Sequence, residues 1–287
     1  MPGTYIEVEI TTDPLLFDDL VGMLSGGGYE GFWEEGSRLR AYIGSGNWNE
    51  ARRDELEQLA EFLTRQHDLP PPSISTRLIE DQNWNALWEA SIQPIRVSGR
   101  IIVAPSWHPY TPETGEIVLT IDPKMSFGTG HHETTRIMVQ LLEKHLRPGD
   151  TVLDVGTGTG ILAIAGLKLG ASSAFAVDND EWSFNNAQEN VKMNGVQDSV
   201  TVLLGEIEQV PRKEFDLVAA NIQRGVIERI LPEMRLRLNA SGHLLLSGLL
   251  DVDREPILAS LDAQRLHVVD ELRDKEWLAL AAVHLRP

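Results

Sequence analysis

The 287-residue sequence predicts an α/β protein built from two domains. In its second half, short apolar strands alternate with helical patterns, which is typical of a mostly parallel sheet. The first of these strands, residues 151–155, leads directly into a glycine-rich turn. In the first 80 residues, the order strand, helix, strand, strand, helix, strand predicts a small ferredoxin-like α+β domain.

The elements of this small domain follow from local patterns. Apolar residues alternate over the first strand, and the run Thr11 to Pro14 is typical of a helix start. Consecutive glycines stop the first helix, and a charged amphipathic pattern predicts the second. The expected elements are residues 4–10, 15–24, 29–35, 39–44, 49–67 and 73–80. We assign residues 1–82 to this domain and expect it to recognise the substrate.

A segment with two tryptophans, Trp84 and Trp88, follows and predicts a connecting helix over residues 81–89. Two short strands come after it. We therefore place a linker at residues 83–99 and a second domain at residues 100–287.

The glycine-rich turn of this second domain follows a strand that contains an acidic residue, Asp154. Gly156, Gly158 and Gly160 alternate along the turn, and residues 161–169 continue as an apolar helix. Glycines let bare backbone approach a ligand, although a plain strand-to-helix turn can have the same composition. The spacing G-x-G-x-G differs from the G-x-G-x-x-G of dinucleotide sites. It resembles the first motif of S-adenosylmethionine (SAM) methyltransferases with a Rossmann-like fold.

Polar side chains follow the next three predicted strands: Asp178, Glu206 and Asn221. Carboxyl ends of parallel strands meet at one edge of a sheet, so these side chains should surround one ligand. An acidic group such as Asp178 can accept both ribose hydroxyls of a nucleoside, although it can also cap the helix that follows. An antiparallel hairpin at the C-terminus is expected of methyltransferases and not of dehydrogenases. We predict SAM as the cofactor.

A second glycine-containing loop, residues 125–136, precedes a helix expected over residues 137–146. Its hydroxyls and glycines suit a loop that closes over a ligand. The adjacent His131 and His132 cannot easily ligate one ion, and no H-E-x-x-H spacing is present, so we predict no metal site.

These motifs together resemble the PrmA family, which methylates protein eleven of the large ribosomal subunit. The loop of this family, F-G-T-G-x-H-x-T-T, matches residues 127–135, and its A-N-I motif matches residues 220–222. Gln223 and Arg224 depart from the commoner apolar continuation. The resemblance implies these roles: SAM contacts for Thr135, Gly156, Asp178 and Asn221; turn formation for Gly158 and Gly160; an adenine neighbour in Glu206; and a mobile lid containing Phe127.

The resemblance further implies methylation of a terminal α-amine and of lysine ε-amines on the ribosomal protein. Asn221 would orient the amine, or hold the amino-acid end of SAM. Two alternatives stay open. The first is a methyltransferase that acts on another amine or on an amide. Glutamine methyltransferases have Asn-Pro-Pro-Tyr where this chain has Asn-Ile-Gln-Arg at residues 221–224, which disfavours an amide substrate. A SAM-binding ribosome-assembly factor without catalysis is the other.

Composition excludes several further classes of protein. Because the chain has no cysteine, it can form no disulfide, no thiolate metal site and no cysteine nucleophile. A net charge of -18 argues against direct binding to nucleic acid, which needs a basic face. No apolar run is long enough to span a membrane, and no signal peptide is apparent, so we expect a cytoplasmic protein. Residues 1–82 hold 16 acidic against 6 basic side chains, a net charge of -10, which suits a basic partner.

Overall fold

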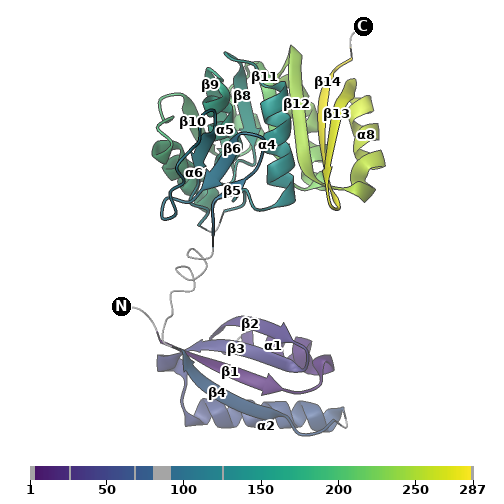
Figure 1. Cartoon of the computed structure of the whole chain (residues 1–287). Helices are drawn as coiled ribbons and strands as arrows, with labels where there is room; N and C mark the ends of the chain where they lie inside the picture. The colour runs from purple at the N-terminus through teal and green to yellow at the C-terminus, as the bar shows by residue number, and fades with distance from the viewer. Residues whose placement is uncertain (1–3, 26, 68, 80–91, 125, 286–287) are drawn as a thin grey trace. The chain divides into compact units, whose positions relative to one another are not determined.

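The computed structural model describes residues 4–25, 27–67, 69–79, 92–124 and 126–285. The chain divides into two compact units, Met1–Glu89 and Ala90–Pro287 (Figure 1). The helix predicted over residues 81–89, with Trp84 and Trp88, lies outside the described residues. Each unit has its own hydrophobic core and is described by itself.

The smaller unit is a four-stranded antiparallel sheet in the order β2-β3-β1-β4. This order and the sequence of elements confirm the predicted ferredoxin-like domain. The elements are β1 (Tyr5–Thr11), α1 (Phe17–Ser25), β2 (Tyr29–Glu35), β3 (Arg38–Gly44), α2 (Glu50–Gln66) and β4 (Ser73–Ile79).

Alternation along the strands decides which face of this sheet the helices cover. Val8 and Ile10 of β1 are fully buried in the core with residues of α1 and α2. Glu7 and Glu9 therefore point to the opposite face, because successive side chains of a strand alternate. Asn49 begins α2 by accepting a hydrogen bond from the backbone N–H of Arg52.

The larger unit is built on a seven-stranded sheet in the order β10-β9-β8-β11-β12-β14-β13. The first five of these strands are parallel, and β14 runs antiparallel to both of its neighbours. The closing antiparallel hairpin predicted from the sequence is therefore present. The strands are β8 (Thr151–Val155), β9 (Ser173–Asp178), β10 (Val200–Leu204), β11 (Phe215–Asn221), β12 (Leu238–Leu250), β13 (Leu266–Asp274) and β14 (Trp277–His284).

Helices cover both faces of this sheet and create two separate cores. Residues of α4, α5 and α6 belong to one core, and residues of α7 and α8 belong to the other (Figure 1). The helices are α4 (Glu133–His145), α5 (Ile161–Leu169), α6 (Glu181–Met193), α7 (Arg224–Leu236) and α8 (Arg254–Ala263). This three-layer arrangement confirms the predicted Rossmann-like domain.

A small sheet of three strands, β5 (Ile95–Arg96), β6 (Ile101–Ala104) and β7 (Ile117–Thr120), packs against the first core. Buried asparagines at the end of α6 and at its C-cap bind the last residue of β7 and the segment that follows it. Asn194 Oδ1 accepts from the backbone N–H of Thr120, and Asn190 Oδ1 accepts from that of Asp122. The sequence pattern does not predict β7 or the long β12. Asn239, Ser241 and Gly242 interrupt the apolar run of β12, which hides it.

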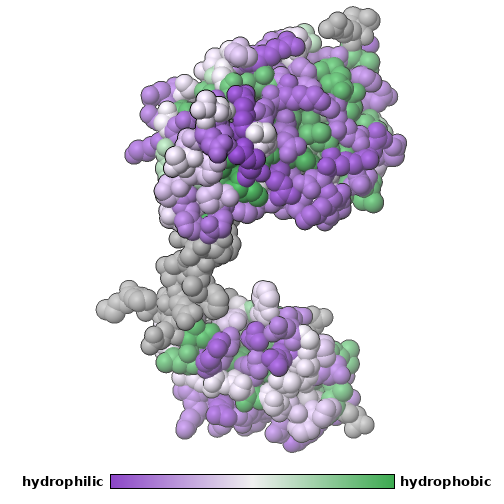
Figure 2. All heavy atoms as spheres, in the orientation of Figure 1, coloured by the Kyte–Doolittle hydropathy of each residue, from purple (hydrophilic) through white to green (hydrophobic). Residues whose placement is uncertain are grey.

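On the visible face of the larger unit, hydrophilic residues predominate and hydrophobic ones are scattered among them (Figure 2). Among the described residues, no helix is long and apolar enough to cross a membrane.

Candidate functional site

A cavity of about 350 Å³ opens at the carboxyl ends of the central parallel strands. Six of the seven residues that we predicted to bind the cofactor line it: Phe127, Gly156, Gly158, Asp178, Glu206 and Asn221. The seventh, Thr135, does not line it. Strands β8, β9, β10 and β11 each lead to this edge, as the topology of a parallel sheet requires.

Asp178 ends β9 and faces the glycine-rich turn. Its Oδ2 accepts a hydrogen bond of 2.9 Å from the backbone N–H of Gly158, and its Oδ1 accepts one of 3.1 Å from that of Asp180. The alternative in which Asp178 caps the next helix is wrong. Asp180 caps α6, since its Oδ2 accepts from the backbone N–H of Ser183 at 2.8 Å. Asp178 thus presents its carboxylate at the cavity wall.

Two glycines of the turn are required by close contacts. Gly156 and Gly158 have φ angles of 70° and 56°, which other residues seldom adopt. A Cβ on Gly156 would overlap the side chain of Ile222, and a Cβ on Gly158 would overlap the carbonyl oxygen of Phe127. The bare backbone of the turn therefore forms part of the cavity wall.

Asn221 and Glu206 stand at the ends of two other strands. The Oδ1 atom of Asn221 is buried and has no hydrogen-bond partner among the described residues. A buried acceptor without a partner is costly, and Asn221 also lines the cavity, so this atom is a candidate acceptor for a ligand donor. Glu206 follows β10, and its Oε1 accepts a hydrogen bond of 2.9 Å from the side-chain amide of Asn179.

Asp154 lies beneath the turn and is completely buried. Its Oδ2 accepts from the hydroxyl of Thr157 at 2.6 Å and from the backbone N–H of Ala163 at 3.2 Å, while Oδ1 has no partner among the described residues. Burial raises the pKa of Asp154 to about 7, against the lowering effect of these two hydrogen bonds. This carboxyl joins the turn to the first turn of α5.

The raised pKa of Asp154 has a consequence for stability. In the folded protein this carboxyl keeps its proton up to about pH 7, whereas in the unfolded chain it ionises near pH 4. The free energy of unfolding should therefore fall as the pH rises through this window. Asparagine in place of Asp154 keeps an acceptor for Thr157 but cannot ionise. Between pH 5 and pH 8, the wild type should lose about 2–3 kcal/mol more than Asp154→Asn.

Chemical denaturation of both proteins at these two pH values measures this difference. Parallel pH profiles for the wild type and Asp154→Asn would show that burial does not hold the proton on this carboxyl.

The start of α4 differs from the sequence-based expectation. The helix begins at Glu133 instead of residue 137, because the Nδ1 atom of His132 caps it by accepting from the backbone N–H of Thr134. Thr135 is consequently inside the first helical turn and fully buried, and its hydroxyl has no partner among the described residues. Its contact with the cofactor stays a prediction.

Sequence reasoning missed one wall of the cavity. Helix α7 contributes Val226, Arg229 and Ile230, and the segment after β10 contributes Ile207. Val226 and Ile230 stand four positions apart, so they share one helix face. This spacing is a usable signal, but it does not distinguish a cavity wall from a core-facing stripe.

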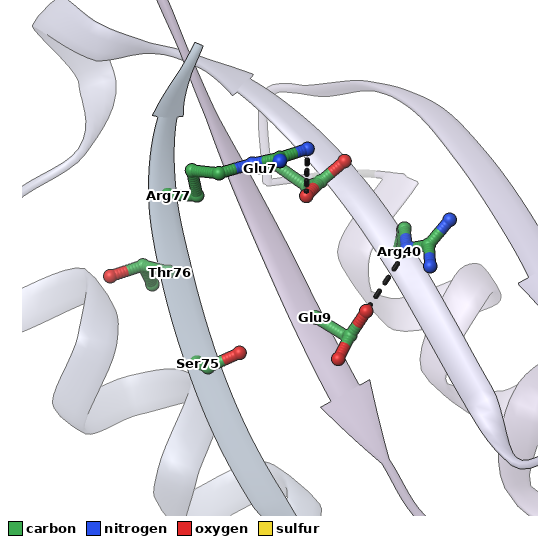
Figure 3. A pocket seen from close by; sticks show the side chains of 6 residues that line it. All are labelled: Glu7, Glu9, Arg40, Ser75, Thr76 and Arg77. Carbon is green, nitrogen blue, oxygen red and sulfur yellow. Dashed lines mark hydrogen bonds and ion pairs between the residues drawn. The ribbon is translucent and has the colours of Figure 1, made fainter.

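A second cavity, of about 280 Å³, lies on the uncovered sheet face of the smaller unit (Figure 3). Two ion pairs cross it: Arg40 Nε lies 3.0 Å from Glu9 Oε2, and Arg77 Nη2 lies 3.0 Å from Glu7 Oε1. Trp33 pairs with Arg40 in the register of β2 and β3 and is 61% exposed. This face combines paired charges with an exposed aromatic ring.

The chain is similar to a known protein family, to named relatives and to a solved structure. The family model described as ribosomal protein L11 methyltransferase (PrmA) matches residues 28–284. The chain belongs to this family. The ribosomal protein L11 methyltransferase of Chloroflexus aurantiacus is 33% identical over 99% of this chain and 98% of its own length. That of Chlorobaculum parvum is 38% identical over 96% of this chain and 95% of its own length.

A solved structure agrees with this membership. The crystal structure of a ribosomal protein L11 methylase from Lactobacillus delbrueckii subsp. bulgaricus matches with a TM-score of 0.63 and 29% sequence identity. The match covers 68% of this chain and 100% of that one. The family and the methyltransferase class predicted from the sequence are thereby confirmed.

Proposed function

We propose that the cavity at the carboxyl edge binds SAM and that the chain transfers its methyl group to amines of ribosomal protein L11. The convergence of Asp178, the glycine-rich turn and Asn221 on one cavity supports the cofactor. Membership of the ribosomal protein L11 methyltransferase family, whose relatives carry that substrate in their names, supports the reaction.

Each group at the cavity suits one part of SAM. The Asp178 carboxylate would accept the ribose hydroxyls, and the backbone of Gly156 and Gly158 would lie against the methionine part. Glu206 would lie near the adenine, with the apolar wall of α7 beside it. Phe127, which lines the cavity and is 51% exposed, would cover the bound cofactor with its ring, and the closing motion of the lid stays a prediction.

The chemistry requires mainly alignment. The methyl sulfonium is already a strong electrophile, so the protein has to place a neutral amine in line with the methyl group and exclude water. A lysine must first lose a proton from a pKa of about 10.4. The unpartnered Oδ1 of Asn221 is a suitable acceptor for the amine N–H and would orient the lone pair of the nitrogen. We therefore assign the orienting role to Asn221.

The smaller unit is proposed to capture the substrate. Residues 1–82 carry a net charge of -10, which complements a basic ribosomal protein and speeds the encounter. We propose the open sheet face as the contact surface, because it presents Trp33 beside Arg40 and also carries the ion pairs of Arg40 and Arg77. Aromatic and arginine side chains of this kind dominate binding energies at protein interfaces. The domain limits 1–82, 83–99 and 100–287 belong to the same proposal.

SAM consumption measured with and without L11 tests this function against both alternatives. Product formation that depends on L11 is the expected result. A methyltransferase for another amine would bind SAM and leave it unconsumed with L11, yet consume it with a different basic ribosomal protein. An assembly factor without catalysis would bind SAM and consume it with neither.

A further inference from the structure

Three aromatic rings form a continuous chain that ends at the cavity. The ring of Phe127 meets that of His132 edge to face, with 5.0 Å between the centroids. The ring of His132 meets that of Trp277 in the same manner at 4.9 Å. Both distances are typical of favourable aromatic pairs. Trp277 is the first residue of β14, so this chain joins the C-terminal hairpin to the cavity wall.

The middle ring cannot turn freely. The Nδ1 atom of His132 accepts from the backbone N–H of Thr134 at 3.3 Å and lies 2.8 Å from the Thr134 hydroxyl. These contacts cap α4 and fix the plane of the imidazole. His132 therefore couples the start of α4 to both aromatic neighbours.

Ion pairs connect the turn of the β13–β14 hairpin to the first turn of α4. The guanidinium of Arg136 donates to Asp274 Oδ2 at 3.1 and 2.6 Å and also donates to the carbonyl of His131. The ammonium of Lys275 lies 2.7 Å from Glu133 Oε1, and this hydrogen bond lowers the pKa of Glu133 to about 2. Hairpin and loop are thus held together through α4.

The backbone of the loop has a separate anchor. The carbonyl of Phe127 accepts from the backbone N–H of Thr159 at 2.9 Å, and the carbonyl of Gly128 accepts from the Thr159 hydroxyl at 2.7 Å. The glycine-rich turn therefore fixes the main chain at Phe127. The half-exposed ring itself contacts the ring of His132.

We infer that Trp277 is a positioning residue, which holds the ring of Phe127 at the cavity by way of His132. The inference rests on the proposed SAM site and extends it to the hairpin, which contributes no residue to the cavity lining among the described residues. Trp277 is not among the described residues that line the cavity, whereas Phe127 is. Trp277 would therefore act on SAM binding only through the position of the Phe127 ring.

Calorimetric titration of the full chain with SAM tests this role. Trp277→Leu should raise the Kd for SAM about 3- to 10-fold, the effect of losing an aromatic pair. Trp277→Phe keeps a ring edge for His132 and should restore most of the affinity. Trp48→Leu, the same substitution at a tryptophan packed against the core of the smaller unit, is the matched control and should leave the Kd unchanged.

A double variant separates positioning from a general loss of structure. If Trp277 acts through Phe127, then Phe127→Leu combined with Trp277→Leu should bind SAM no more weakly than Phe127→Leu alone. The inference would be overturned if the fold-increases in Kd of the two single variants multiply in the double variant. An unchanged Kd for folded Trp277→Leu would also overturn it. A wild-type chain that fails to bind SAM would instead refute the proposed cofactor.

If Trp277→Leu does not fold, the same cycle is run with His132→Asn. Asparagine caps helices well but has no ring. This variant therefore keeps the start of α4 and removes the ring between Phe127 and Trp277. Its effect on the Kd should likewise disappear when Phe127 is already leucine. If the fold-increases in Kd of His132→Asn and Phe127→Leu multiply in the double variant, the inference would be overturned.

Discussion

Alanine in place of Asp178 should weaken SAM binding by about 1–3 kcal/mol, the range for losing a charged hydrogen-bond acceptor. Its carboxylate is the one that the structure places at the end of β9 on the cavity wall, oriented by the backbone N–H groups of Gly158 and Asp180. Those two groups hold the carboxylate in one orientation before the ligand arrives. Isothermal titration calorimetry of wild type and variant measures the difference.

Controls distinguish this loss from damage to the turn. Asp178→Asn keeps the shape and one acceptor oxygen, so its affinity should fall between those of wild type and Asp178→Ala. Asp262→Ala removes an exposed carboxylate from α8, outside the cavity lining, and should bind SAM like the wild type. An unchanged Kd for folded Asp178→Ala would contradict the proposal that the Asp178 carboxylate accepts the ribose hydroxyls of SAM.

Removal of the smaller domain should separate cofactor binding from protein methylation. A fragment of residues 83–287 should bind SAM with near-native affinity, because the described residues that line the cavity all lie in the larger unit. It should lose about 100-fold or more in kcat/KM for the ribosomal protein, since the second point of attachment is gone. Calorimetry and a methylation assay on the same fragment measure both effects.

Two results would contradict this division of roles between the two domains. Transfer to the ribosomal protein at the full rate would defeat the recognition role of residues 1–82. Loss of SAM binding together with methylation would mean that these residues stabilise the larger unit. In the full chain, Trp33→Leu should raise the KM for the protein substrate and leave the Kd for SAM unchanged, which assigns recognition to the open sheet face.

Local sequence patterns predicted the parts of the site that lie at strand ends. The glycine-rich turn follows a short apolar strand and Asp178 ends another, so both are recognisable from a few consecutive residues. The order of strands then brings Glu206 and Asn221 to the same edge. For these residues, the parallel topology converts a spacing along the chain into a position in space.

The parts that could not be predicted depend on contacts between distant segments. The ring chain from Phe127 to Trp277 spans 150 positions of sequence, and its two ring contacts exist only in the folded protein. The start of α4 was missed because a histidine cap is unusual and propensity favours serine, threonine, asparagine or aspartate. Strand β12 was missed because polar residues and a glycine interrupt its apolar pattern.

The central claim is that this chain methylates amines of ribosomal protein L11 with SAM bound at the carboxyl edge of the sheet. Intact-mass spectrometry of L11 after incubation with SAM and the chain tests it most directly, with Asp178→Ala as the matched site variant. We predict that L11 gains mass in steps of one methyl group with the wild type and far more slowly with Asp178→Ala. An L11 mass that stays unchanged, while the wild type binds SAM, would contradict the claim.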